Sequence, residues 1–133
     1  MIPARLGSKR VKKKNLRLID GLPLIQYIIN AAKQSTLIDE IYINSESTQF
    51  EDIAKKSGVK FYQRPKNLSS DTATNDDFAL DFIDQFECDI LVQLLSTSPF
   101  VTPAEIDGFI KAMLDGDFET MVSVVDVRIE CLY

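Results

Sequence analysis

Residues 2–15 read IPARLGSKRVKKKN, a short apolar segment that runs directly into a positively charged loop. No acidic residue occurs before Asp20. The segment and the residues just after it hold seven of the fifteen basic residues, namely Arg5, Lys9, Arg10, Lys12, Lys13, Lys14 and Arg17. We interpret residues 1–4 as the end of a first β-strand. The basic segment is favoured as an anion-binding loop held at both ends, and the alternative is a solvated basic tail.

Beyond this loop, short apolar runs alternate with segments of helical periodicity. Strands are expected at residues 41–43, 59–62, 90–95 and 120–125, and helices from Leu22 onward, up to Gly58, over 78–86 and over 102–116. The run 90–95 is almost continuously apolar, as is typical of a strand buried on both faces. Strands separated by helices of this length predict an α/β fold with a mainly parallel sheet flanked by helices. No second domain is visible, so residues 1–133 are expected to form a single domain.

Local signals support these boundaries. The dipeptide Asp20-Gly21 predicts a turn with positive φ angles. Thr102 and Glu105 have the spacing of a capping box, with Pro103 at the first helical position. The aromatic residues Phe78, Phe82 and Phe86 share a helical face and are expected in the core.

Composition excludes several classes of protein. The chain has 133 residues, 45% of them hydrophobic, and no apolar run approaches the roughly 18 residues that a membrane span needs. The basic N-terminus is not followed by an apolar region, so it is not typical of a secretory signal. Cys88 and Cys131 form no CxxC motif, which predicts neither a disulfide framework nor a zinc knuckle. We therefore expect a cytoplasmic protein that does not contact membranes.

The chain contains no histidine, so Ser-His-Asp and Cys-His catalysis and HExxH zinc sites are all excluded. Any chemistry must use Lys, Arg, carboxylates, hydroxyls, backbone amides or a hard metal ion. The formal charge is −5, and removal of the seven basic residues near the N-terminus leaves −12 on residues 18–133. An acidic body of this kind argues against nucleic acid as the partner.

The topology of a parallel sheet predicts where the ligand binds. Ligands of such sheets bind at the carboxyl ends of the strands. This rule places the basic loop, residues 44–46, Arg64-Pro65, Thr97-Ser98 and Asp126 around one crevice.

The basic loop has groups suited to phosphate, although it matches neither the Walker A motif nor GxGxxG. Gly7 lets backbone amides approach an anion closely, and Ser8 adds a hydroxyl donor. Arg5 can form two parallel hydrogen bonds to phosphate oxygens, whereas Lys9 and Lys14 act as mobile point charges.

The opening segment, from Ile2 to Lys9 and on to Lys14-Asn15-Leu16, resembles the N-terminal signature of acylneuraminate (sialic acid) cytidylyltransferases. The likeness covers the whole chain, through residues 21–25, 41–46, 64–65, 68–71 and 97–99. It implies a Rossmann-like nucleotide-diphosphosugar transferase fold. It also implies a reaction in which the anomeric hydroxyl of a nonulosonic acid attacks the α-phosphate of CTP, pyrophosphate leaves and Mg²⁺ assists.

The resemblance also assigns expected roles to individual residues. Contacts to the nucleotide are implied for Arg5, Gly7, Ser8, Lys9, Lys14, Asn15, Arg64, Ala73 and Asn75, with Arg5 and Lys14 catalytic. The sugar is expected near Leu95, Thr97 and Ser98. Other interpretations remain open, because Arg64 can cap a strand, Asn75 can cap a helix and Asp71 can form a turn. Glu46, Asp76 and Asp77 are expected to be solvated surface more often than metal ligands.

The chain departs from the family pattern at several positions. Leu95 stands where the family usually has a glutamine, and Asn75 where it usually has a serine. The pair of aspartates that hold Mg²⁺ and the dimerisation insert of the family cannot be assigned, so the chain looks like an N-terminal portion, and no metal ligand is predicted. The alternatives are a KDO cytidylyltransferase, a non-catalytic nucleotide-binding remnant of the fold, and a module that binds polyanions. A homodimer is implied by the family only.

Overall fold

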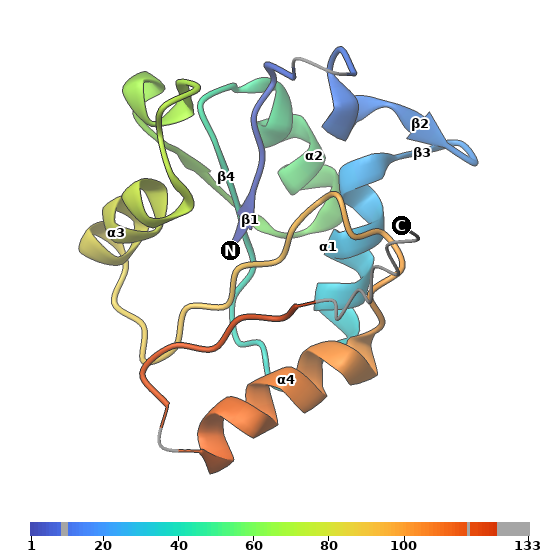
Figure 1. Ribbon diagram of the computed structural model, residues 1–133. Helices are drawn as coiled ribbons and strands as arrows, with labels where there is room; N and C mark the ends of the chain where they lie inside the picture. The colour runs from blue at the N-terminus through green and yellow to red at the C-terminus, as the bar shows by residue number, and fades with distance from the viewer. Residues whose placement is uncertain (9–10, 117, 125–133) are drawn as a thin grey trace, which may run out of the picture.

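The computed structural model describes residues 1–8, 11–116 and 118–124. Its central feature is a parallel sheet of β1 (Ile2–Pro3), β4 (Tyr42–Ser45) and β5 (Lys60–Gln63), with β4 in the middle (Figure 1). Ile2 is paired with Ile43, and Ile43 with Phe61. The predicted residues Lys9, Arg10, Val125, Asp126 and Cys131 lie outside the described part.

Helices cover both faces of this sheet, as the sequence predicts. α1 (Leu24–Gln34) and α2 (Gln49–Ser57) lie on one face, and α3 (Asn75–Gln85) lies on the other (Figure 1). The first face forms the main core, which consists of Ile2, Ala4, Ile25, Ile28, Ile29, Ile43, Phe50 and Ala54. α4 (Pro103–Asp115) packs through Ile106 and Ile110 against Ala31 of α1. The α/β architecture with a mainly parallel sheet and flanking helices is therefore confirmed.

An aromatic cluster fills the space between the sheet and α3. Tyr42 and Tyr62 point from β4 and β5 to this face, and Phe82 and Phe86 meet them with ring centroids 4.7–5.8 Å apart. Phe78 and Phe82 are buried. The prediction that this stripe belongs to the core is confirmed.

Several predicted helix ends and turns are confirmed. Asp20 and Gly21 have φ angles of 48° and 78°, and Gly58 ends α2 with a φ of 67°. The capping box of Thr102 and Glu105 opens α4. A second capping box, which was not predicted, opens α3: the Thr74 hydroxyl accepts the Asp77 N–H, and the Asp77 carboxylate accepts the Thr74 N–H. Asn75 is the first residue of that helix and is not its cap.

The expected helix beginning at Leu22 starts two residues late. Leu22–Pro23 (β3) pairs in antiparallel register with Leu18–Ile19 (β2) around the Asp20-Gly21 turn, and α1 begins at Leu24. Between β5 and α3, the chain forms the short 3₁₀ helix η2 (Lys66–Ser69). The β2–β3 hairpin and η2 were not predicted, because short hairpins and 3₁₀ turns have weak sequence patterns.

The expected strand at 90–95 is wrong as an element of secondary structure. Met1 bonds to its backbone twice: the N-terminal ammonium group donates to Val92 O at 2.8 Å, and the Met1 carbonyl oxygen accepts the Leu94 N–H at 3.0 Å. This pair of bonds follows the parallel pattern, so the segment runs beside β1 without forming a ladder. Leu95 is 46% exposed and not buried on both faces. Residues 120–124 form no strand either. The last predicted strand, at 120–125, is therefore wrong for the residues that the structure describes.

The described residues form four α-helices, α1 to α4. None of them is long and apolar enough to cross a bilayer.

One carboxylate links α4 to the segment that follows α1. Asp107 accepts hydrogen bonds from the Ser35 hydroxyl, from the Thr36 hydroxyl at 2.7 Å and from the Thr36 backbone N–H at 3.1 Å. These hydrogen bonds favour the charged carboxylate, and they lower the pKa of Asp107 to about 2, with the Ser35 hydroxyl contributing most.

We predict that Asp107→Asn destabilises the fold in a pH-dependent way. Because the folded-state pKa lies below the ordinary value of 3.8, the carboxylate stabilises the fold above about pH 4. That contribution is lost as the pH falls toward 2. Urea-unfolding midpoints should therefore differ between wild type and variant at pH 6 and converge near pH 2. Asp115→Asn, at the exposed end of the same helix, is the control, and a gap that stays constant with pH would contradict the account.

Candidate functional site

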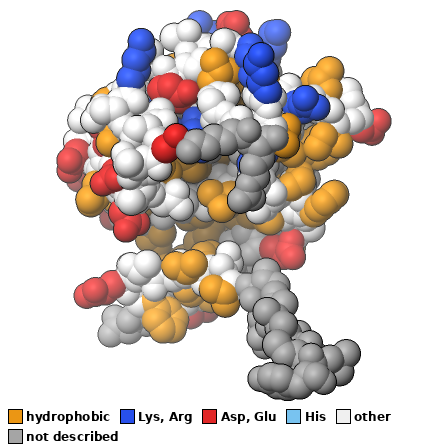
Figure 2. Space-filling model, turned by 45° about the horizontal axis from the view of Figure 1, so that its top comes forward, with side chains coloured by type: hydrophobic (Ala, Val, Ile, Leu, Met, Phe, Trp, Pro, Cys, Tyr) orange, Lys and Arg blue, Asp and Glu red, His pale blue; other side chains and the backbone are white. Residues whose placement is uncertain are grey.

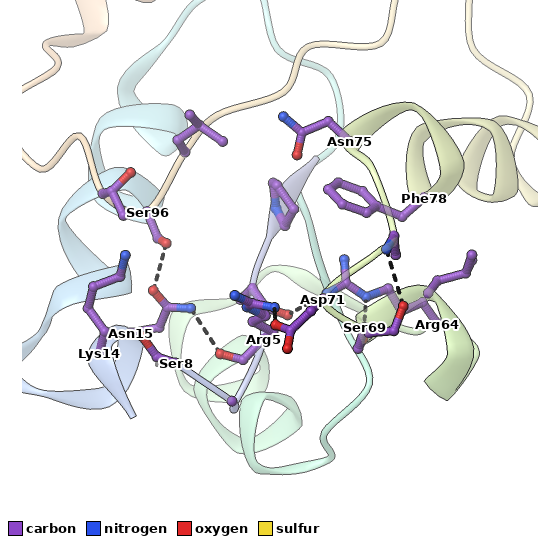
Figure 3. A pocket seen from close by; sticks show the side chains of 18 residues that line it. Arg5, Ser8, Lys14, Asn15, Arg64, Ser69, Asp71, Asn75, Phe78 and Ser96 are labelled. Atoms are coloured by element: carbon purple, nitrogen blue, oxygen red, sulfur yellow. Dashed lines mark hydrogen bonds and ion pairs between the residues drawn. The ribbon is translucent and has the colours of Figure 1, made fainter. Parts of the chain in front are cut away.

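A cavity of about 380 Å³ opens at the carboxyl-terminal edge of the parallel sheet (Figure 3). The loop after β1 and the chain after β5 form two of its walls, and the segments around α3 and residues 95–97 complete it. Ten predicted site residues line it, namely Arg5, Gly7, Ser8, Lys14, Asn15, Arg64, Ala73, Asn75, Leu95 and Thr97. Ser98 is not among its lining residues, and Lys9 lies outside the described part.

Backbone hydrogen bonds explain why these loops meet. The parallel pairing continues one residue past the strands, since Ala4 N–H bonds to Asn44 O at 2.9 Å and Arg64 N–H bonds to Ser45 O at 3.1 Å. These bonds fix the starting points of both loops at one edge of the sheet. Figure 2 shows Lys and Arg side chains gathered over this upper part of the molecule.

Arg5 bridges the mouth of the cavity to Asp71. Its Nη1 lies 3.2 Å from Asp71 Oδ1, and the two side chains are 41% and 55% exposed. Exposed ion pairs of this kind contribute at most about 1 kcal/mol. A polyanion can therefore displace Asp71 from Arg5. The interpretation of Asp71 as a mere turn former misses this ion pair.

Asn15 lies behind the basic loop and is buried. Its Nδ2 donates to the Arg5 carbonyl at 3.2 Å, and its Oδ1 accepts from the Ser96 hydroxyl at 2.8 Å. The side-chain amide therefore braces the backbone at Arg5. Ser96 was not predicted as a site residue, although it stands between two predicted site residues, Leu95 and Thr97, which was an available signal.

Arg64 is the most deeply buried charged residue at the cavity, with 4% of its surface exposed. Its Nε donates to the Ser69 hydroxyl at 3.0 Å, its Nη2 donates to Ala4 O at 3.3 Å, and its guanidinium lies 4.7 Å from the Phe78 ring centroid. Burial lowers the pKa of Arg64, and the negative charge of Glu46 counteracts this effect. These contacts go well beyond a strand cap.

The remaining guanidinium nitrogen of Arg64 has no hydrogen-bond partner among the described residues. This Nη1 is buried, and Arg64 is one of the residues that line the cavity. An unsatisfied buried donor typically costs about 1–3 kcal/mol, and more where the group is charged. A ligand atom that accepts a hydrogen bond there would remove this cost.

The expectation that Glu46 is solvated surface is wrong. Its side chain is only 17% exposed, and its Oε1 accepts the Leu6 backbone N–H at 2.8 Å. Its Oε2 lies 3.8 Å from Arg64 Nη2. Asn44 and Ser45, which the topology rule also selected, are buried beneath the cavity and do not line it.

The described residues do not provide a fitting site for Mg²⁺. No group of three or more Asp, Glu, Cys or His side chains that could hold a metal ion occurs in residues 1–8, 11–116 and 118–124. Glu46 already accepts the Leu6 N–H, and Asp77 accepts the Thr74 N–H at 2.7 Å as part of a capping box. Hard cations need several free oxygen ligands, and these carboxylates are committed elsewhere.

The arrangement is therefore suited to an anion with an attached polar group. Arg5, Lys14 and the amides around exposed Gly7 lie at one wall, where they can meet several phosphate oxygens. Arg64 and the segment of Ala73 and Asn75 form another wall of the same cavity.

Comparison with known proteins shows that this chain is similar to cytidylyltransferases. A sequence model of the family described as "Cytidylyltransferase" matches residues 1–131. N-acylneuraminate cytidylyltransferase of Oncorhynchus mykiss is 28% identical in an alignment of 130 residues that covers 94% of this chain and 29% of that protein. CMP-N,N'-diacetyllegionaminic acid synthase of Legionella pneumophila is 38% identical in an alignment of 112 residues that covers 80% of this chain and 48% of that protein.

A solved structure agrees with the sequence comparisons. CMP:2-keto-3-deoxy-manno-octonic acid synthetase complexed with CTP superimposes with a TM-score of 0.76 and 26% identity, over 86% of this chain and 46% of that one. The chain thus spans less than half the length of these relatives. Since the family match covers nearly all of its residues, the chain belongs to the cytidylyltransferase family.

Proposed function

We propose that the cavity binds CTP and that the protein containing this chain transfers the cytidylyl group to a nonulosonic acid of the sialic type. The triphosphate would lie against Arg5, Gly7, Ser8, Lys9 and Lys14, with Asn15 behind them. The cytidine would lie beside Arg64, Ala73 and Asn75, and the sugar near Leu95, Thr97 and Ser98. Support comes from the family match and from the collection of ten of these residues around one cavity.

The observation that carries the proposal is the buried Arg64 guanidinium, one nitrogen of which has no hydrogen-bond partner among the residues that the structure describes. The side chain is already fixed by Ser69, Ala4 and Phe78, so little conformational entropy is lost when a ligand binds. A cytosine carbonyl is an acceptor of the required kind. Fixed donors of this type favour one nucleobase over another, because a wrongly placed donor on the ligand leaves Arg64 unsatisfied.

The proposed reaction needs charge stabilisation more than covalent chemistry. The anomeric hydroxyl loses its proton to solvent as its oxygen forms a bond to the α-phosphorus. The bond from that phosphorus to the bridging oxygen breaks, and pyrophosphate leaves with the electron pair. Arg5 and Lys14 are the proposed catalytic residues, which hold the polyphosphate and offset the charge that develops on the leaving group. Mg²⁺ would enter with the nucleotide, and we assign no step to it because the described residues offer no ligand set.

A KDO-type substrate is the second candidate, because CMP:2-keto-3-deoxy-manno-octonic acid synthetase shares the fold closely. The sialic-type acid is preferred since the relatives in sequence are an acylneuraminate and a legionaminate enzyme. The Lys14-Asn15 pair and the absence of an acidic residue at positions 95–99 also favour this branch. Homodimer formation remains a prediction from the family resemblance.

Titration with nucleotides tests the proposed ligand directly. We expect CTP to bind more tightly than GTP, and the preference to persist when the salt concentration is raised, because base recognition depends on a buried donor. Isothermal calorimetry at low and high salt measures both effects. Equal binding of CTP, GTP and short DNA that disappears with salt would instead indicate a polyanion-binding module.

The variant Arg5→Ala is predicted to weaken CTP binding by about tenfold, because it removes a guanidinium that can contact the phosphates in two places. Arg17→Ala is the matched control, since Arg17 is exposed and does not line the cavity. Unchanged affinity in Arg5→Ala would remove this residue from the site.

Catalytic turnover by residues 1–133 alone is predicted to be feeble or absent. Pyrophosphate release is measured with CTP, Mg²⁺ and N-acetylneuraminic acid, and the metal ligands are missing from the described part of the chain. Robust release would show that residues 1–133 contain a sufficient ligand set, with Asp126 as the first residue to substitute.

A further inference from the structure

The carboxylate of Glu46 joins three loops around the cavity without lining it. It follows β4 directly and accepts the backbone N–H of Leu6, in the loop after β1, at 2.8 Å. Its other oxygen accepts from the Ser69 hydroxyl of η2 at 3.2 Å and lies 3.8 Å from Arg64 Nη2. The carboxyl ends of all three paired strands are thus linked through one side chain.

The hydrogen bond from Leu6 to Glu46 holds the loop backbone beside the cavity. Leu6 lies between Arg5 and Gly7, which both line the cavity. Hydrogen bonds from a backbone N–H to a charged carboxylate are among the stronger ones in proteins, and 17% exposure of the Glu46 side chain limits competition by water. Glu46 therefore fixes the course of the loop backbone on which the polyphosphate is proposed to lie.

The negative charge of Glu46, taken alone, disfavours the binding of a polyanion at the cavity. A carboxylate close to a site for a polyanion repels the ligand, so electrostatics by itself predicts tighter binding once Glu46 is removed. A favourable contribution of Glu46 can only come from geometry. Removal of Glu46 therefore weakens ligand binding if Glu46 acts by positioning its neighbours, and tightens it if charge repulsion dominates.

We propose that Glu46 is a positioning residue, which holds the Leu6 backbone and the Arg64 guanidinium in the arrangement that receives the polyphosphate of the nucleotide. This inference rests on the proposed function and adds to it a residue that never touches the ligand. The Leu6 hydrogen bond carries most of the effect, because it is the shortest contact of the carboxylate with any of the three loops.

Two substitutions separate geometry from charge. Glu46→Ala removes both the acceptor and the charge, whereas Glu46→Gln keeps an oxygen that can accept the Leu6 N–H. Glu51→Ala is the matched control, since it deletes the same charge from an exposed ion pair with Lys55 on α2. Thermal melting confirms that each variant is folded.

Binding is measured by calorimetry with CTP and with inorganic tripolyphosphate, and the exchange rate of the Leu6 amide hydrogen is measured by NMR. We expect Glu46→Ala to bind both ligands at least tenfold more weakly and to exchange the Leu6 amide at least tenfold faster. Glu46→Gln should stay within threefold of wild type in affinity. Glu51→Ala should bind as tightly as wild type or slightly more tightly.

Three results overturn the role of Glu46: undiminished binding by Glu46→Ala, an unchanged Leu6 exchange rate in that variant, or equal weakening by the alanine and glutamine variants. Wild-type protein that binds no CTP overturns the proposed function itself. Wild-type binding that Glu46→Ala retains in full overturns only the positioning role.

Discussion

The parallel pairing of β1, β4 and β5 is the constraint on which the rest of the structure depends. It orients all three strands the same way, so their carboxyl ends and the polar segments that follow lie at one edge. The pairing continues through the N–H groups of Ala4 and Arg64, which places Arg5 and the Arg64 side chain at the same cavity. Residues about sixty positions apart in the chain become neighbours for this reason.

The site combines an exposed part with a rigid one. Arg5 is half-exposed and paired with Asp71 at the mouth, where a ligand can compete for it. Arg64, Asn15 and Glu46 are largely buried and are held by hydrogen bonds to the loops around them. Mobile cations are suited to neutralising phosphates, and fixed donors are suited to recognising a base. A site that combines exposed cations with fixed, buried donors fits a nucleotide better than it fits a simple anion.

The sequence predicted the parts of this protein that depend on local patterns and topology. Helical periodicity and the glycines at 21 and 58 located helices and turns, and the rule for parallel sheets located the crevice. The segment 90–95 was predicted wrongly because apolar composition cannot show how many hydrogen bonds a neighbouring strand will supply. Glu46 and Ser96 were missed as contacts because their partners, Leu6 and Asn15, are 40 and 81 residues away. Contacts of that range follow from the fold and leave no periodic trace in the sequence.

A crystal structure of the chain with CTP tests the central claim most directly. The account predicts the triphosphate against Arg5, Gly7, Ser8 and Lys14, and a cytosine oxygen within hydrogen-bond distance of Arg64 Nη1. Electron density for CTP elsewhere, or a saturated crystal in which the cavity stays empty and Arg5 remains paired with Asp71, would contradict it.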